Sequence, residues 1–173
     1  IGSAVIEGLD AGGRLSCAKH FPGHGGTTED SHAITPTVDK SLEALKSYDL
    51  VPFVSAISSG VDAIMVAHVL YPALDATDIA SVSKPIITDL LRTQMGFTGL
   101  VISDDFRMEG LLTRYEIGDA AVRFVLAGGD IIMCGAESEK QQAIADALIT
   151  AAGDGRLTQE RIDESVKRIL LKK

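Results

Sequence analysis

Short apolar runs alternate with longer amphipathic segments along the 173 residues of the chain. The apolar runs are typical of buried strands and cover residues 15–20, 63–67, 100–103 and 130–134. In the segments that follow, apolar residues recur every three or four positions, which indicates helices over 42–58, 84–95, 116–127, 139–152 and 158–171. The alternation of strand and helix predicts parallel βα units.

Glycines mark the points where predicted helices return to strands. Gly96 and Gly128 each follow a helical pattern, where glycine takes a positive φ at no steric cost. Four βα units supply half of a (β/α)8 TIM barrel, because a whole barrel needs roughly 250 residues. An open α/β sheet is the alternative. We find no linker or repeat, and therefore expect no domain boundary within residues 1–173.

The composition excludes several classes of partner. With 46% hydrophobic and 23% charged residues, the chain has the composition of an ordinary globular domain. Its net charge of −8 disfavours nucleic acid and anionic membrane surfaces. No apolar stretch reaches the roughly 20 residues that span a bilayer. Cys17 and Cys134 lie in predicted buried strands, so we expect two free core thiols rather than a disulfide.

The first predicted strand leads into a loop dense in polar groups, residues 19–25 with the sequence KHFPGHG. Pro22 and the glycines prevent a helix, so His20 and His24 do not share a helix face as the histidines of zinc proteases do. Lys19 and His20 instead suit hydrogen bonding to hydroxyl groups of a substrate. We expect His24 to hydrogen-bond locally and fix the loop.

Further along this loop, Asp30 lies two residues before His32. At this spacing the carboxylate can hydrogen-bond the imidazole, orient the ring and raise its basicity. His32 would then be able to give and take a proton. The same pattern also occurs in surface turns and helix caps, and this alternative stays open.

Two later strands also end on polar side chains. Asp104 and Asp105 follow the third apolar run and point to opposite faces if the strand continues, so only one can face a barrel axis. That carboxylate could attack an anomeric carbon or bind a divalent metal, and Asp105 could instead cap the following helix. His68 follows the second run and either lines a pocket or is a structural histidine.

Taken together, these motifs resemble a known family. The segment 19–25 with Asp30 and His32 closely resembles the signature of family 3 glycoside hydrolases that act as β-N-acetylglucosaminidases of the NagZ type. Residues 103–108 (SDDFRM) resemble the nucleophile strand of that family, and residues 65–68 (MVAH) resemble an intervening strand. Gly26 departs from the pattern, because an aspartate is common there.

The resemblance implies a retaining exo-β-N-acetylglucosaminidase in which Asp104 is the nucleophile and His32, paired with Asp30, is the acid/base. It implies no metal and no cofactor. The implied substrates are N-acetylglucosamine-containing muropeptides of bacterial peptidoglycan recycling or chitin-type fragments. The residues implied to bind the sugar are Lys19, His20, His68 and Met108.

The family's barrel also supplies sugar-binding residues from earlier strands, which have no counterpart here. We therefore expect residues 1–173 to be the C-terminal portion of one barrel domain, with the missing N-terminal half as its partner and with incomplete activity alone. The chain begins at Ile1 within a helical pattern, as though an upstream segment were absent. The compartment stays open, with the cytoplasm slightly favoured.

Other functions remain as alternatives. A family 3 β-glucosidase is disfavoured by the Asp30 and His32 pattern, whereas a phosphorylase that uses phosphate in place of water is compatible with it. A different class of function makes these two residues a zinc site with His20 and His24. A fourth alternative is a fragment that binds sugar without turnover.

Overall fold

The structure is a computed structural model that describes residues 1–27 and 35–173. Its four strands form one sheet in the order β1-β2-β3-β4, and all three neighbouring pairs are parallel. The four strands confirm the predicted βα arrangement, with shifts of a few residues at their ends. Their bounds are β1 (Cys17–Phe21), β2 (Ala63–Val66), β3 (Leu100–Asp105) and β4 (Ile131–Met133).

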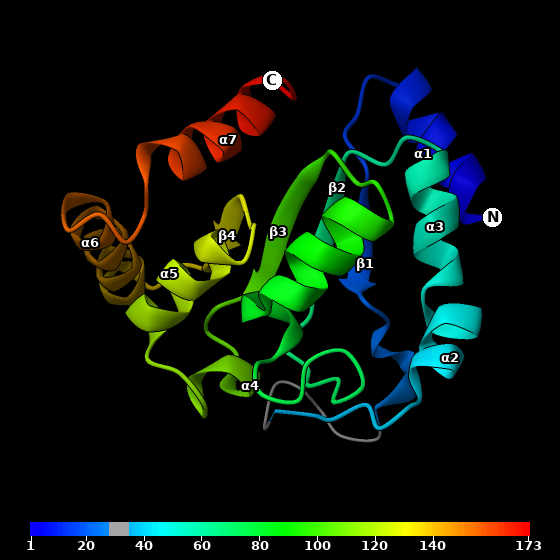
Figure 1. Ribbon diagram of the computed structural model, residues 1–173. Coiled ribbons are helices and arrows are strands. Elements are labelled where there is room, and N and C mark those ends of the chain that lie inside the picture. Colours follow the sequence, from blue (N-terminus) through cyan, green and yellow to red (C-terminus); the bar gives the residue numbers. More distant parts are fainter. Residues whose placement is uncertain (28–34) are drawn as a thin grey trace.

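Helical segments precede, connect and follow the strands (Figure 1). The α-helices are α1 (Gly2–Ala11), α2 (Leu42–Ala44), α3 (Val51–Ser58), α4 (Glu109–Leu112), α5 (Ile117–Leu126), α6 (Ser138–Gly153) and α7 (Gln159–Leu170). Two segments are π-helical, η2 (Leu45–Asp49) and η4 (Pro85–Gln94), and two are short 3-10 turns, η1 (His24–Gly26) and η3 (Ala80–Val82). The helix expected over 42–58 is thus divided into α2, η2 and α3.

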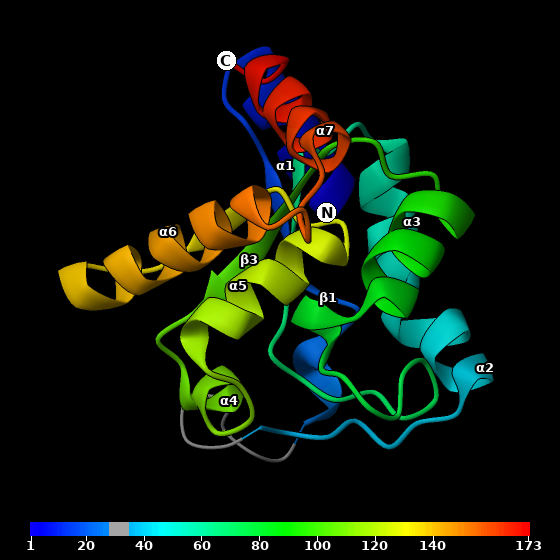
Figure 2. The same ribbon diagram turned by 60° about the vertical axis from the view of Figure 1, so that its left-hand side comes forward.

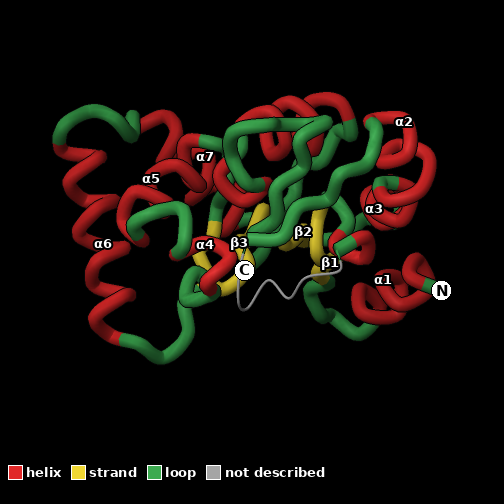
Figure 3. The backbone as a smooth tube through the Cα atoms, turned by 90° about the horizontal axis from the view of Figure 1, so that it is seen from below, coloured by secondary structure: helices red, strands yellow, loops and turns green. Residues whose placement is uncertain are grey.

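The two faces of the sheet are buried to different extents. Ile64 and Val101 are paired across β2 and β3 and are fully buried, whereas their neighbours Met65 and Ile102 are half-buried. Successive side chains on a strand point to opposite faces, so one face carries the hydrophobic core and the other is more open. Figure 3, seen along the sheet, shows most of the helices gathered around one side of the strands.

The two outer strands are less buried than the two central ones. Cys17 and Lys19 of β1 are exposed, as is Met133 of β4. The prediction that both cysteines lie in the core was therefore wrong: both are free, but Cys17 is exposed and Cys134 is half-exposed. The reason is that β1 and β4 are edge strands within the described part of the chain, and a sequence run does not indicate where in a sheet its strand lies.

Because all strands run the same way, the loops that follow them meet at one end of the sheet. This end carries α4 in Figure 1, whereas α7 and the C-terminus lie at the opposite end. Figure 2 shows α6 extending outward beside α5, where Gly118 of α5 allows close contact with Ala147 of α6. None of the described helices is long and apolar enough to cross a membrane.

A buried charge network attaches α7 to the sheet. The side chain of Asp130, just before β4, is fully buried and accepts hydrogen bonds from Arg92 (2.7 Å) and Arg168 (2.9 Å). It also accepts one from the hydroxyl of Ser165 at 2.7 Å and one from the N–H of Val101 at 2.9 Å. Burial lowers the pKa of Arg92, and the Asp130 carboxylate opposes this shift. The network thereby holds α7 against the end of the sheet where the strands begin.

Candidate active site

The end of β1 brings the imidazole of His20 toward β3. Pairing between β1 and β2 is regular at Ala18 but shifts before Phe21, so one extra residue is accommodated between them. Such a bulge changes the direction of the side chains beside it. Lys19 is exposed, and the half-buried His20 points toward Asp104 of β3. The peptide bonds Lys19–His20 and Phe21–Pro22 are both cis. The imidazole of His20 lies beside Asp104, the predicted nucleophile.

Asp104 lies at the C-terminal end of β3. Its Oδ1 accepts a hydrogen bond of 2.9 Å from the N–H of Asp105, and its Oδ2 lies 3.7 Å from His20 Nε2. The side chain of Asp104 is 12% exposed and that of His20 is 29% exposed. Burial lowers the pKa of His20, and the charge of Asp104 opposes the shift. The result is a carboxylate held in a fixed position beside an imidazole.

His68 lies beneath these groups and is fully buried. Its Nε2 is 3.2 Å from the carbonyl oxygen of Asp105, which can only accept, and its Nδ1 is 2.8 Å from Ser81 Oγ. Nε2 therefore carries a proton, and in the neutral ring the Ser81 hydroxyl donates to Nδ1. Burial lowers the pKa of His68 to about 4. Both ring nitrogens serve the structure under the strand end.

The neighbouring carboxylate has a different environment. Asp105 forms a two-pronged ion pair with Arg107, whose Nη2 is 2.6 Å from Oδ2 and whose Nε is 3.1 Å from Oδ1. This guanidinium lowers the pKa of Asp105. A Cβ added to Gly135 would overlap the guanidinium, so the loop after β4 lies directly against Arg107. The expected helix cap is wrong, because Met108 is the N-cap of α4 and Asp105 binds Arg107 instead.

A second ion pair packs against the turn η1. Lys40 Nζ is 2.8 Å from both carboxylate oxygens of Asp49, whose side chain is 6% exposed. A Cβ at Gly23 would lie 2.8 Å from Asp49 Cβ, and one at Gly26 would lie 2.9 Å from Lys40 Cε. Gly23 also has a φ of +133°, so glycine is required there, whereas a side chain at position 26 would need the end of the Lys40 side chain to move.

His24 itself forms the local contact that we expected. Its Nδ1 lies 2.9 Å from Thr27 Oγ1, and the same hydroxyl donates to the His24 carbonyl at 3.0 Å. The His24 ring also lies 6.0 Å from the ring of His20, in an edge-to-face arrangement. The turn therefore places a second imidazole beside the end of β1.

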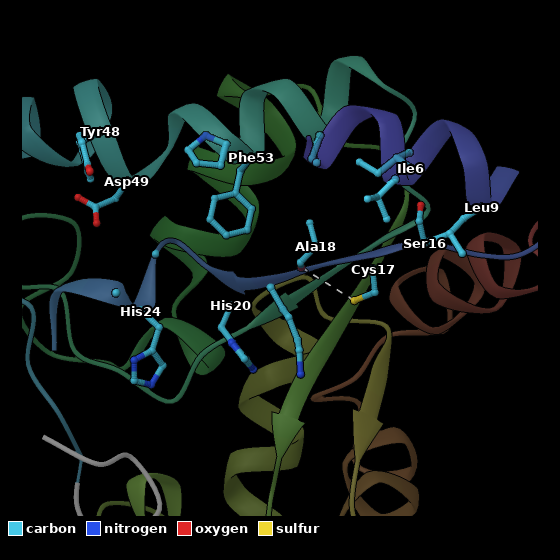
Figure 4. A pocket seen from close by; sticks show the side chains of 17 residues that line it. Ile6, Leu9, Ser16, Cys17, Ala18, His20, His24, Tyr48, Asp49 and Phe53 are labelled. Carbon is cyan, nitrogen blue, oxygen red and sulfur yellow. Dashed lines mark hydrogen bonds between the residues drawn. The ribbon is translucent and has the colours of Figure 1, made fainter.

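A cavity of about 540 Å³ lies between β1, α1 and α3 (Figure 4). Apolar side chains such as Ile6 and Phe53 line one end, and His20 and His24 line the other. Asp104 is not among its lining residues. The cavity therefore lies along β1 and meets the candidate site at Lys19, His20 and His24.

The remaining predicted site residues are placed as follows. Met108 is 8% exposed, so its side chain packs within the protein at the start of α4. Asp30 and His32 lie outside the described residues. Within residues 1–27 and 35–173, no group of three or more His, Cys, Asp or Glu side chains could hold a metal ion. The zinc hypothesis requires Asp30 and His32, so the described residues do not test it.

Two residues at this end of the sheet were not anticipated. Ser81 is fully buried and fixes His68, and Arg107 holds Asp105 and lies 3.7 Å from Glu137. No sequence pattern indicates either role. Ser81 contacts His68 from a different loop, and Arg107 contacts Asp105, for which the sequence left two roles open. The contacts show that Asp104 and Asp105 have different environments, because Arg107 pairs with Asp105 alone.

The sequence profile described as "Glycosyl hydrolase family 3 N terminal domain" matches residues 1–171. The chain belongs to glycosyl hydrolase family 3. A family 3 relative, the "Beta-hexosaminidase" of Chromobacterium violaceum, is 40% identical over 151 residues, which cover 86% of this chain and 41% of the relative. The chain thus spans less than half the length of this curated relative.

Solved family 3 structures superpose closely on the chain. The β-N-acetylglucosaminidase of Paenibacillus sp. str. FPU-7 has a TM-score of 0.96 and 42% identity, covering 98% of this chain and 32% of that one. A structure named "Beta-glucoside phosphorylase BglX" has a TM-score of 0.90 and 26% identity, covering 98% of this chain and 32% of that one. These neighbours are barrel domains of the family, which confirms the predicted fold class.

Proposed function

We propose that the full-length protein is a retaining exo-β-N-acetylglucosaminidase that removes terminal β-linked N-acetylglucosamine from muropeptide or chitin-type fragments. The names of the similar family 3 proteins support this substrate class. The observation that carries the proposal is the Asp104 carboxylate at the end of β3, with one oxygen held by a backbone N–H and the other 3.7 Å from His20 Nε2. Asp105 is a weaker candidate because Arg107 occupies both of its oxygens.

The proposed reaction has two steps. In the first, the Asp104 carboxylate attacks the anomeric carbon while the bond to the leaving oxygen breaks, and protonated His32 gives its proton to that oxygen. In the second, water adds to the anomeric carbon, its proton passes to His32, and the bond to Asp104 breaks. Two inversions at one carbon retain its configuration. Asp30 orients His32 in this scheme, as the family resemblance implies.

The other site residues divide into two groups in this proposal. Lys19 is exposed and His20 has a lowered pKa, so a cation and a neutral imidazole are both available to the sugar hydroxyls. The buried positions of His68 and Met108 favour an indirect role, in which they support the strand end and the start of α4. We also propose that the four βα units are the later half of one barrel, in keeping with the order of the motifs.

The direct test is hydrolysis of an aryl β-N-acetylglucosaminide by the full-length protein, with the aryl β-glucoside as the control substrate. Asp104→Asn should reduce turnover on the order of 10⁴-fold, since it removes the nucleophile. Asp105→Asn is the matched control, one residue along the same strand. A 2-fluoro glycoside should label Asp104, and label on Asp105 would contradict the assignment. No turnover of either sugar would refute the proposed activity.

Phosphorolysis is the second candidate, favoured by the close superposition on a structure named as a β-glucoside phosphorylase. A histidine acid/base also suits it, because an imidazole does not repel an incoming phosphate as a carboxylate does. The assay is product analysis in phosphate buffer. A sugar 1-phosphate would establish phosphorolysis, whereas free N-acetylglucosamine at a rate independent of phosphate would exclude it.

A further inference from the structure

The chain that returns from the β1 loop is attached to the β2 loop. The Val38 N–H donates to the Leu70 carbonyl at 2.9 Å, and the Leu70 N–H donates to the Pro36 carbonyl at 3.0 Å. Thr37 and Leu70 form an isolated parallel bridge. These contacts hold the segment from Pro36 onward in place, and Thr35 is the residue immediately before it.

Thr35 makes a contact of a different kind, to the start of α4. Its hydroxyl donates to the carbonyl oxygen of Gly110 at 2.7 Å and lies 3.1 Å from Thr113 Oγ1. The N–H groups of residues 113–115 donate to the carbonyls of Glu109 and Leu111, the residues on either side of Gly110. The Gly110 carbonyl therefore receives its hydrogen bond from a side chain 75 residues earlier in the sequence.

Gly110 is in turn fixed relative to Asp104. The carbonyl of Asp105, the next residue after Asp104, accepts a hydrogen bond of 3.0 Å from the Met108 N–H and a second from His68 Nε2. Met108 caps α4, and Gly110 and Leu111 are buried within it. A short, well-packed path thus leads from the nucleophile to the carbonyl that Thr35 binds.

We propose that Thr35 is a positioning residue that fixes the β1 loop relative to the nucleophile strand. The proposal rests on the proposed function, in which the acid/base is His32, three residues before Thr35 in the sequence. The Thr35 hydroxyl joins the described end of the β1 loop to Gly110, in the segment after β3, whereas the residues that follow Thr35 are bonded to the β2 loop. Loss of this hydrogen bond should slow the proton transfer that the proposed function assigns to His32, while leaving the nucleophile in place.

The test compares Thr35→Val, which keeps the shape and loses the donor, with Thr35→Ser, which keeps the donor, in the full-length protein. Thr35→Val should lower kcat by roughly 2- to 12-fold on alkyl β-N-acetylglucosaminides, the range in rate that one neutral hydrogen bond corresponds to. It should change kcat less than about 2-fold on nitrophenyl substrates, whose leaving groups need little protonation. Thr35→Ser should resemble the unmodified protein on both.

Thr93→Val is the matched control, because Thr93 also donates to a backbone carbonyl, that of Thr88 at 3.0 Å, but on the exposed side of η4. Thr35→Ala serves if Thr35→Val does not fold. Equal losses on both substrate classes, or equal losses in Thr35→Ser and Thr35→Val, would overturn the inference. If the unmodified protein is active and Asp104→Asn is not, such a result leaves the proposed function standing. An inactive unmodified protein overturns both.

Discussion

The Asp130 network predicts that one carboxylate contributes strongly to the stability of the protein. Its side chain is fully buried, whereas those of Arg92 and Arg168 are 12% and 23% exposed. Asp130→Ala would leave the largely buried guanidinium of Arg92 without its anion and the Val101 N–H without its acceptor. Arg168 would keep only Glu164, at 3.6 Å, and the Ser165 hydroxyl would keep only its 3.2 Å contact with the Gly129 carbonyl. Removing one partner from a buried ion pair costs about 3–5 kcal/mol.

This cost is large compared with a total stability of about 5–15 kcal/mol for a typical protein. The estimate concerns a pair broken on one side. It does not imply that the network stabilises the fold more than apolar residues of the same size would, because desolvation of buried charges offsets much of their attraction. Asp130→Asn should cost less than Asp130→Ala, since an amide oxygen can still accept some of the hydrogen bonds.

The assay is urea unfolding of the full-length protein, followed by circular dichroism, with the free energy of unfolding extrapolated to water. Asp89→Ala is the matched control, because Asp89 pairs with Lys84 at 2.9 Å but both side chains are more than half exposed. Exposed pairs contribute about 0–1 kcal/mol. If Asp130→Ala costs no more than Asp89→Ala, the reasoning about this network is wrong.

Three further predictions follow from the site. Because burial lowers the pKa of His68 to about 4, the unfolded chain binds a proton more readily, so stability should fall by about 3 kcal/mol as the pH drops from 6.5 to 4. The pKa of His20 is lowered as well. The dependence of stability on pH should therefore weaken more in His68→Asn than in His20→Asn. His32→Ala should slow alkyl glycosides far more than nitrophenyl glycosides, and equal losses would contradict its role as acid/base. Gly135→Ala should displace the Arg107 guanidinium and lower the melting temperature, whereas Gly153→Ala, with open space around it, should not.

Much of the fold could be predicted because it depends on local pattern. The four strands, the glycine turns at Gly96 and Gly128, and the long helices follow from hydrophobic periodicity and from the backbone freedom of glycine. The exposure of Cys17 could not be predicted, because an apolar run does not reveal whether its strand lies at the centre or the edge of a sheet. The division of the helix over 42–58 was also not visible in its apolar positions.

The site was predictable only in part. The approach of His20 to Asp104 follows the expectation that strand ends meet, and the local role of His24 was anticipated. The choice between Asp104 and Asp105 rested on resemblance until the ion pair with Arg107 showed how they differ. The full burial of His68 depends on Ser81, a partner from a separate loop that no local spacing reveals.

The attachment of α7 has a consequence for how the protein is made. Arg168 follows Asp130 by 38 residues, and Lys172, which is ion-paired with Asp62, follows it by 110. At about 5–20 residues per second, a ribosome needs roughly 2–8 s to supply the first cation and roughly 5–22 s to supply the second. During that interval the Asp62 carboxylate must stay hydrated, whereas Asp130 can already pair with Arg92, which precedes it in the sequence. The end of the sheet where the strands begin therefore stays incompletely covered on the nascent chain until α7 has been synthesised.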